Sequence, residues 1–523
     1  MPGTVVDRLR ERARQFPDSV ALVDVTRGAS LTYAELFDRA ARVASALVAR
    51  GFRKGDAVLA YLPNAHEAVE CELGALASGC AWITLTARLT WPEVRGVVVA
   101  CEPQLIVTNA AGARTIRDGL AAFPIEALPP LVITGGEGSV KEHPGALDYE
   151  AWLLTAPPNF PSLDVGREDV ARLRYTSGTT GTAKAAVLPH RVYHASLDTL
   201  LDELGPWTAA DRALHVAPLT HGSGALAHPV MHAGGINVLR QHFDVNDVLS
   251  DIAHHRITTL FTVPTMLSRL VSASNFGQYD LSSLRAVVYG GAPMPEAQLA
   301  LAVARLGHAL VQIYGMTEAP WPITVLKPAD HTPKNPRLHS VGRATRTTEV
   351  RIGDGSRDLA SGEVGEIHLR GDNVMTGYYR DEAGTRDVLV DGWLRTGDVG
   401  KKDDDGYLYI VGRQKDVIIS GGFNVYASEV EAAISSVGGV LEVAVVGLPH
   451  DDWGELVAAF VVTEPGAPLT THDVEAATRR RLSGYKVPRH IEIVSDLPKN
   501  ASGKIQKSEL VRRVTAAGPS AAR

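Results

Sequence analysis

Residues 175–184, YTSGTTGTAK, place hydroxyl groups and glycines around a single lysine, directly after a short run typical of a β-strand. Glycine lets backbone amides approach an anion closely, and Ser, Thr and Lys side chains add further donors. A triphosphate needs such donors, so the segment predicts a nucleotide-binding loop. The residues expected to contact the phosphates are Thr176, Ser177, Gly178, Thr179, Thr180, Gly181 and Lys184.

Two observations narrow the identity of this loop. The Walker A pattern is not met, because Ala183 precedes the lysine and Ala185 follows it, where that pattern requires Gly and then Ser or Thr. A second segment, GSGALA at 222–227, matches a loose dinucleotide fingerprint, so a nicotinamide oxidoreductase is a remote alternative. Pro218 and His221 separate these glycines from the preceding apolar run. A tight turn between a strand and a helix is the simpler interpretation.

Strand-like and helix-like segments alternate on both sides of the loop. The apolar runs 57–62 and 82–85 flank a helical segment at 65–78, which predicts a βαβ unit. After residue 349, short alternating runs separated by Gly and Asp turns predict antiparallel β-structure. The last roughly 100 residues hold a further series of strands and helices, about the size of a domain. We therefore predict an α/β fold with layered α/β subdomains and a β-rich subdomain at 1–414, and a small α+β C-terminal domain at 415–523.

Composition excludes several classes of protein. The 523 residues exceed what a single core usually organises, and 45% hydrophobic and 21% charged residues are ordinary for a globular chain. A formal net charge of -7 gives no general electrostatic footprint for nucleic acid. Cys71, Cys80 and Cys101 show neither a secretory disulfide pattern nor metal-ligand spacing. No segment reaches the roughly 20 apolar residues of a membrane span. We expect a cytoplasmic protein with no membrane span and no nucleic-acid partner.

Four later clusters carry polar groups suited to a nucleotide: YGMTE at 314–318, WLRTGD at 393–398, GRQKD at 412–416 and PKNASGK at 498–504. Thr317 and Glu318 supply a hydroxyl and a carboxylate for a phosphate and its Mg²⁺. Asp398 is suited to accept hydrogen bonds from ribose hydroxyls. Each cluster alone is most often an exposed charged turn. Together they predict one nucleotide site assembled from distant parts of the chain.

These motifs occur in the order found in the superfamily of acyl- and aryl-CoA synthetases, peptide-synthetase adenylation domains and luciferases, which the chain resembles from Leu31 to Lys504. The resemblance implies ATP and Mg²⁺ as cofactors. It also implies that a small carboxylic acid attacks the α-phosphate of ATP, releasing pyrophosphate and leaving an acyl-adenylate. A thiol, most often that of CoA, would then displace AMP. A homodimer is compatible with the resemblance.

The resemblance assigns roles to individual residues. Those implied to bind ATP are residues 176–181, Lys184, Tyr314, Asp398 and Arg413. Those implied to act in catalysis are Thr317, Glu318 and Lys504. Glu318 would hold Mg²⁺, and Asp398 and Arg413 would bind the ribose. Lys504 would bridge the acyl carboxylate and the α-phosphate, placing one positive charge where negative charge gathers.

The C-terminal domain is mobile in this family. Members reuse one site by rotating that domain about a pivot, which corresponds here to Lys415. Gly421 and Gly422 would then line a thiol tunnel, where absent side chains allow close approach. Phe423 follows them where the family usually has Glu, which leaves the acceptor open. The alternatives to CoA ligation are carrier-protein loading, amide formation and a nitrite-activating diazotase.

The acid pocket implied by the resemblance has small, backbone-rich walls that leave room for a ring or a chain. It consists of His221, Val263, Gly290, Gly291, Ala292, Gly315 and Met316. We interpret His221 as a residue packed against the ligand and not as a base. No basic side chain in this set would clamp a second carboxylate, which favours a monocarboxylic aryl or medium acyl substrate.

Overall fold

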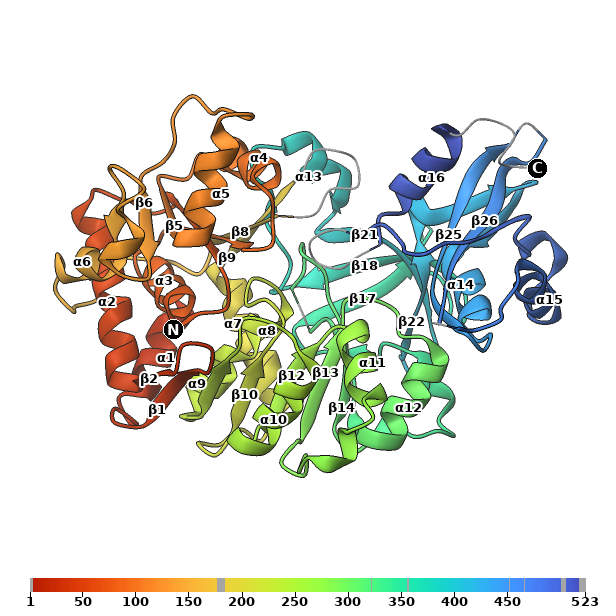
Figure 1. Cartoon of the computed structure of the whole chain (residues 1–523), viewed down its shortest axis with the longest axis horizontal. Helices are drawn as coiled ribbons and strands as arrows, with labels where there is room; N and C mark the ends of the chain where they lie inside the picture. Colours follow the sequence, from red (N-terminus) through yellow and green to blue (C-terminus); the bar gives the residue numbers. More distant parts are fainter. Residues whose placement is uncertain are drawn as a thin grey trace.

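The computed structural model describes residues 3–175, 184–320, 322–354, 357–450, 452–464, 466–499 and 505–516. Within these ranges the chain forms four β-sheets covered by helices (Figure 1). The predicted loop at 176–181 and Lys504 lie outside the described residues. The layered sheets confirm the predicted α/β class, with a β-rich C-terminal part. The domain boundary at residue 415 stays a prediction.

The eight-stranded sheet contains the predicted βαβ unit. Strands β3 and β4 pair in parallel, with Ala57 opposite Ala81, and helix α3 connects them. Every residue of β3 is buried, as is typical of a parallel strand covered on both faces. The sheet order is β19-β9-β8-β4-β3-β5-β6-β7. Its strands are β3 (Ala57–Leu62), β4 (Ala81–Thr86), β5 (Leu105–Asn109), β6 (Leu131–Thr134), β7 (Leu147–Asp148), β8 (Val170–Tyr175), β9 (Ala185–Pro189) and β19 (Gly377–Tyr378). The helices in this part of the chain are α2 (Tyr33–Ala49), α3 (His66–Ala77), α4 (Trp91–Cys101), α5 (Ala110–Leu120), α6 (Tyr149–Leu154) and α7 (His190–Glu203).

Strands β8 and β9 fix the two ends of the predicted nucleotide loop. They are antiparallel neighbours, and Tyr175 lies opposite Ala185. The intervening segment therefore connects two adjacent strands, whereas a Walker A loop connects a strand to a helix. Strand β19 pairs with the other edge of β9, which brings residues 377–378 beside the end of the loop.

The nine-stranded sheet has a parallel centre and antiparallel edges, in the order β16-β15-β14-β13-β12-β10-β11-β1-β2. The N-terminal hairpin of β1 and β2 was not predicted from the sequence. It joins this sheet because β1 pairs in parallel with β11, with Leu22 opposite Asn237. Its strands are β1 (Val20–Asp24), β2 (Ala29–Thr32), β10 (Arg212–His215), β11 (Ile236–Leu239), β12 (Thr259–Thr262), β13 (Ala286–Gly290), β14 (Leu310–Tyr314), β15 (Thr324–Leu326) and β16 (Arg343–Ala344). The associated helices are α1 (Val5–Ala13), α8 (Gly222–Ala225), α9 (Ala227–Ala233), α10 (Val245–His255), α11 (Pro264–Ser272) and α12 (Glu296–Leu306).

Two smaller sheets complete the fold. The sheet of β17 (Thr348–Gly353), β18 (Gly365–Gly371), β20 (Leu389–Val390), β21 (Trp393–Lys402) and β22 (Leu408–Arg413) is antiparallel, as predicted, and carries α13 (Glu382–Val388). The C-terminal sheet consists of β23 (Val417–Ser420), β24 (Phe423–Tyr426), β25 (Val440–His450), β26 (Gly454–Thr463) and β27 (His490–Ile493). It packs with α14 (Ala427–Ser435), α15 (Thr471–Arg481) and α16 (Lys507–Ala516).

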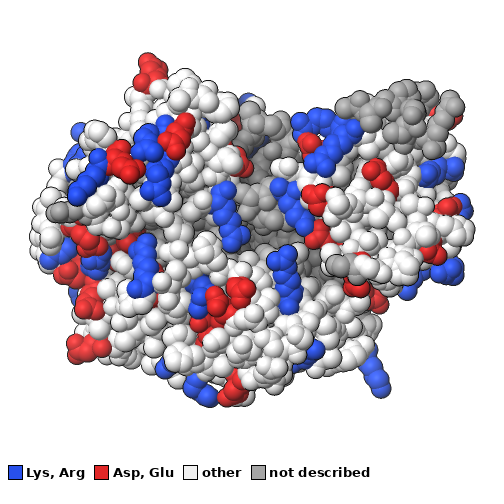
Figure 2. All heavy atoms as spheres, in the orientation of Figure 1, with Lys and Arg blue, Asp and Glu red and all other residues white. Residues whose placement is uncertain are grey.

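The C-terminal sheet and its helices form a lobe at the right of Figure 1, beyond the sheet that contains β17, β18 and β21. Figure 2 shows that the surface is hollowed between this lobe and the rest of the chain, and that both basic and acidic side chains lie around the hollow.

Candidate active site

Three of the predicted ATP-binding residues come into contact where the nine-stranded sheet meets the antiparallel sheet of β21 and β22. Tyr314 ends β14, Asp398 lies in β21, and Arg413 ends β22 directly opposite Asp398. The Tyr314 hydroxyl donates to Asp398 Oδ2 at 2.6 Å, and Arg413 Nε lies 2.9 Å from Oδ1. Burial and the adjacent Asp398 carboxylate raise the pKa of Tyr314 well above its usual value, so the phenol stays a hydrogen-bond donor. The Asp398 carboxylate is buried and held from both sides.

The predicted metal ligand Glu318 follows β14 and is also buried. Its Oε1 accepts a hydrogen bond of 2.9 Å from the hydroxyl of Tyr378, a residue of β19. Burial and the Glu318 carboxylate raise the pKa of Tyr378. Because β19 pairs with β9, Tyr378 links Glu318 to the strand that follows the predicted loop. The neighbouring Thr317 is partly buried.

Lys184 lies at the end of the predicted loop and already contacts other protein groups. Its Nζ is 2.8 Å from Asp381 Oδ2 and 4.9 Å from the centre of the Tyr378 ring. The Lys184 ammonium, followed by the backbone N–H of Gly384, lowers the pKa of Asp381. Lys184, Tyr378 and Glu318 thus form a connected polar group at the start of β9.

The predicted acid-pocket residues follow four parallel strands of the nine-stranded sheet. His221 follows β10, Val263 follows β12, residues 290–292 end or follow β13, and residues 315–316 follow β14. The carboxyl ends of parallel strands share one edge of a sheet, which is the usual place for a ligand in an α/β fold. Gly290 is also needed for packing, since a Cβ there would lie 2.4 Å from the Ile313 carbonyl oxygen.

His221 begins helix α8, and its Nδ1 lies 2.7 Å from the Thr220 hydroxyl. Its side chain reaches solvent, yet protein atoms crowd it. This desolvation, followed by the positive charges of Arg174 and Arg172, holds the pKa of His221 well below its usual value. A neutral imidazole agrees with the predicted packing role. The glycines of 222–224 lie inside α8, and residues 216–221 separate them from β10, so the predicted tight turn is not formed.

Arg172 and Arg174 were not among the site residues predicted from sequence. Both lie on β8, immediately before the predicted loop. Arg172 Nη2 donates to the Thr220 carbonyl at 2.9 Å and to the Thr84 hydroxyl, so it fixes the turn that carries His221. The sequence signal, two arginines at alternate positions of an otherwise apolar strand, is visible in RLRYTSG at 172–178. A strand covered on both faces seldom carries such a pair.

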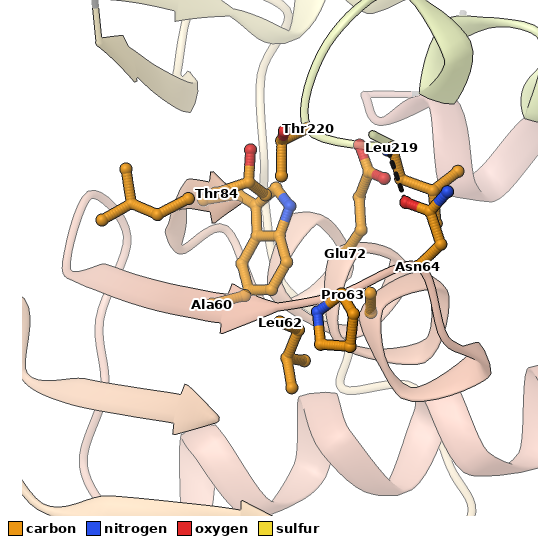
Figure 3. Close-up of a pocket in the computed structure, with 11 residues that line it drawn as sticks. Ala60, Leu62, Pro63, Asn64, Glu72, Thr84, Leu219 and Thr220 are labelled. Carbon is orange, nitrogen blue, oxygen red and sulfur yellow. Dashed lines mark hydrogen bonds between the residues drawn. The ribbon is translucent and has the colours of Figure 1, made fainter. Parts of the chain in front are cut away.

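A small cavity of about 20 Å³, lined by both apolar and polar residues, lies beside the same turn and is large enough for about one water molecule. Figure 3 shows Thr84 and Thr220 at one side of it and Asn64 and Glu72 at another. Asn64 Oδ1 accepts a 2.9 Å hydrogen bond from the backbone N–H of Leu219, which ties β3 to the turn after β10. Asn64 therefore holds the turn in place. The cavity beside it is too small for an acyl group.

The predicted pivot and tunnel residues lie close together along the start of the C-terminal sheet. Lys415 lies in the 3₁₀ turn Gln414–Asp416 between β22 and β23. Burial and the Arg413 charge lower the pKa of Lys415, and nearby Asp416 opposes this shift. Gly421 and Gly422 form the turn between β23 and β24, both with positive φ.

Phe423, the residue after these glycines, is 57% exposed. Its ring stacks on that of Tyr485, with centroids 4.7 Å apart and an interplanar angle of 30°. The stack leaves an aromatic surface at the predicted thiol tunnel instead of the carboxylate that the family usually has there. The surface at this position is therefore aromatic and apolar.

The described residues offer no cluster of metal ligands and no membrane-spanning helix. Among them, no group of three or more His, Cys, Asp or Glu side chains is arranged to hold a metal ion. Glu318 is the predicted protein ligand, and Mg²⁺ is commonly held by one or two carboxylates together with phosphates and water. No helix in the described part of the chain is both long and apolar enough to cross a membrane.

Asp398 is held by Tyr314 and Arg413, Glu318 is held by Tyr378, and the motifs that contain these residues occur in the order found in AMP-forming ligases. Residues 9–379 match the AMP-binding enzyme family, and residues 429–504 match the AMP-binding enzyme C-terminal domain. The chain belongs to the AMP-binding enzyme family. This excludes the nicotinamide alternative, whose glycines are part of α8.

Known members of the family align with nearly the whole chain. A feruloyl-CoA synthase from Amycolatopsis sp is 38% identical over 505 residues, which are 96% of this chain and 97% of the relative. ATP-bound MatB from Rhodopseudomonas palustris is 32% identical, with a TM-score of 0.87 over 98% of this chain and 99% of that one. The amide bond synthetase McbA from Marinactinospora thermotolerans is 31% identical, with a TM-score of 0.86 over 97% and 99% of the two chains.

Proposed function

We propose that this enzyme activates a small carboxylic acid with ATP and transfers the acyl group to the thiol of CoA. The observation that carries the proposal is the buried Asp398 carboxylate, which is held between Arg413 and Tyr314, the last residue of the strand that Glu318 follows. The similarity to a feruloyl-CoA synthase and to an ATP-bound relative supports both the nucleotide and the acceptor.

The nucleotide fits the described groups. Each Asp398 oxygen uses one lone-pair site on Tyr314 or Arg413 and keeps a further one for a ribose hydroxyl. Glu318 uses Oε1 for Tyr378, which leaves Oε2 for Mg²⁺. When bound, Mg²⁺ neutralises phosphate charge that would otherwise repel the attacking carboxylate. Thr317 and residues 176–181 are proposed to hold the phosphates.

The reaction balances in two steps. A carboxylate oxygen of the acid attacks the α-phosphorus of ATP, and the bond to the pyrophosphate oxygen breaks. The thiol sulfur then attacks the acyl carbon, loses its proton, and AMP leaves. We assign Lys504 to the first step, because one ammonium between the carboxylate and the α-phosphate offsets their repulsion. We assign Lys415 as the pivot that exchanges Lys504 for Gly421 and Gly422 in the second step.

Product analysis tests the acceptor. The enzyme is incubated with ATP, Mg²⁺ and a panel of aryl, fatty, amino and dicarboxylic acids, with and without CoA. We expect ATP to be converted to AMP and pyrophosphate, and an acyl-CoA to form only when CoA is present. Formation of ADP and phosphate would contradict the proposal.

A second candidate keeps the adenylation step and changes the acceptor to an amine or a carrier-protein thiol. It is favoured by the exposed Phe423 at the predicted tunnel and by the similarity to an amide bond synthetase. If acid and ATP give AMP but CoA neither accelerates the reaction nor appears in a product, this candidate replaces CoA ligation. Adding an amine in place of CoA then identifies the acceptor.

A further inference from the structure

Arg172 and Arg174 share one face of β8 but differ in what surrounds them. Side chains two residues apart point to the same side of a strand, so both guanidinium groups lie on the side of the Thr220–His221 turn. Arg172 donates to Thr84 and to the Thr220 carbonyl. Arg174 is partly buried, and among the described residues no carboxylate forms an ion pair with it and no acceptor forms a hydrogen bond. Arg172 therefore has a structural role that Arg174 lacks.

The surroundings of Arg174 are unfavourable for an unpaired cation. Burial, followed by the charge of Arg172, lowers the pKa of Arg174 to about 10, while Glu318 and Glu72 oppose this shift. The guanidinium is still charged at neutral pH. A partly buried charge without a partner is less stable than a paired one, and proteins normally pair such charges. Within the described chain the pairing is incomplete, so the position is suited to an anion from the ligand.

The location of Arg174 indicates that the anion it would bind belongs to the acid substrate. It lies one residue before Tyr175, which ends β8, and close enough to His221 to lower the pKa of that imidazole. His221 follows β10 at the edge of the sheet where the acid pocket is proposed. Arg174 thus lies on the same side of β8 as the Thr220–His221 turn, near the predicted acid-pocket residue His221.

We propose that the acid substrate carries a second oxyanion, such as another carboxylate, which pairs with the guanidinium of Arg174 while the first carboxylate reacts. The planar fork of Arg matches a carboxylate through two parallel hydrogen bonds. This inference rests on the proposed function and names its substrate class. It differs from the expectation of a monocarboxylic acid, which considered only the pocket residues implied by resemblance and did not include β8.

Pairs of acids of similar size provide the test. Butyrate is compared with succinate, and 4-methylbenzoate with terephthalate, by acid-dependent exchange of pyrophosphate into ATP. In the pair that the wild-type enzyme uses more efficiently, we expect kcat/KM to be at least about tenfold higher for the dicarboxylate than for the monocarboxylate. A tenfold difference corresponds to the free energy of roughly one charge-assisted hydrogen bond. Arg174→Gln should abolish this preference by raising the KM for the dicarboxylate, and Arg174→Lys should retain part of it.

Controls separate this role from folding and from nucleotide binding. Arg370→Gln removes an arginine whose partner is the exposed Glu349 and should leave the preference unchanged. Thermal unfolding shows whether Arg174→Gln is folded. If the variant is not folded, the inference is tested by the wild-type enzyme alone, through its kcat/KM for the two acids of each pair. A phosphate of ATP is also an oxyanion, so the KM for ATP is measured in parallel and should change less than about threefold.

Several results would overturn the inference. They are a wild-type preference for the monocarboxylates, activity with nitrite alone, a dicarboxylate preference that survives in Arg174→Gln, or a rise in the KM for ATP without one for the acid. In each of these cases adenylation itself stands. If no acid supports exchange, the proposed function is wrong and this inference falls with it.

Discussion

At the scale of single residues, the hydroxyl of Tyr378 orients the carboxylate of Glu318. The 2.9 Å bond holds Oε1 and leaves Oε2 without a hydrogen bond from Tyr378, and the ring of Tyr378 also contacts Lys184. Groups that orient a metal ligand commonly affect metal affinity about tenfold or more. We therefore predict that the Tyr378 hydroxyl, and not its ring, affects the affinity of the enzyme for Mg²⁺.

Tyr378→Phe removes this hydroxyl and keeps the ring. We expect the Mg²⁺ concentration for half-maximal activity to rise by about five- to tenfold, corresponding to roughly 1 kcal/mol for one hydrogen bond. The measurement is the rate of AMP formation as Mg²⁺ is varied at saturating acid. Tyr409→Phe is the matched control, because the Tyr409 hydroxyl donates to Asp403, which is not a proposed site residue. An unchanged Mg²⁺ requirement in Tyr378→Phe would show that Glu318 does not hold the metal.

The sequence identified the site residues that belong to motifs and missed those that do not. Tyr314, Asp398 and Arg413 were predicted as parts of one site, and the structure places their side chains in contact. Tyr378 and Asp381 could not be found in this way, because their contacts depend on the pairing of β19 with β9, almost 200 residues apart in the chain. Long-range pairing leaves no local pattern in the sequence.

At the scale of elements, local patterns predicted strands and helices well where both ends carry signals. The predicted run 57–62 is β3, and the predicted helical segment 65–78 contains α3. Strand β1 was missed because its position depends on β11, far along the chain. Strand β25 extends over Val440–His450 because it pairs along its length with β26.

The turn between β23 and β24 allows a comparison of two adjacent glycines. Gly421 and Gly422 both have positive φ, which costs about 1–2 kcal/mol for another residue. Only at Gly421 would a Cβ collide with a neighbour, at 2.7 Å from Cε3 of Trp453. Gly421→Ala should therefore lower the thermal stability of the protein more than Gly422→Ala.

Differential scanning calorimetry of the two variants measures this difference, and Gly422→Ala serves as the matched control for the backbone strain. Equal losses would mean that the Trp453 ring moves aside without cost. In that case the close approach of Trp453 would not explain why glycine occupies position 421.

At the scale of the whole molecule, the proposed second step requires the C-terminal lobe to move. The only described covalent link between β22 and β23 is the short turn at Gln414–Asp416, which contains Lys415. Proline fixes φ and restricts the residue before it, so Lys415→Pro should hinder rotation. Lys415→Ala leaves the backbone free and is the matched control.

We expect Lys415→Pro to slow acyl transfer to CoA by about tenfold or more while formation of the acyl-adenylate changes less than about threefold. Rapid-quench measurements of the two half-reactions, with adenylate formed before CoA is added, separate these rates. If both rates fall equally in Lys415→Pro, or if Lys415→Ala has the same effect, the turn is not the pivot.

The central claim is that the enzyme joins an acid to AMP before any acceptor takes part. The most direct measurement is the exchange of labelled pyrophosphate into ATP by the wild-type enzyme and by Lys504→Ala, without CoA. The account predicts exchange that requires an acid, proceeds without CoA, and is largely lost in Lys504→Ala. Exchange that requires CoA, or no exchange with any acid by a folded enzyme, would contradict it.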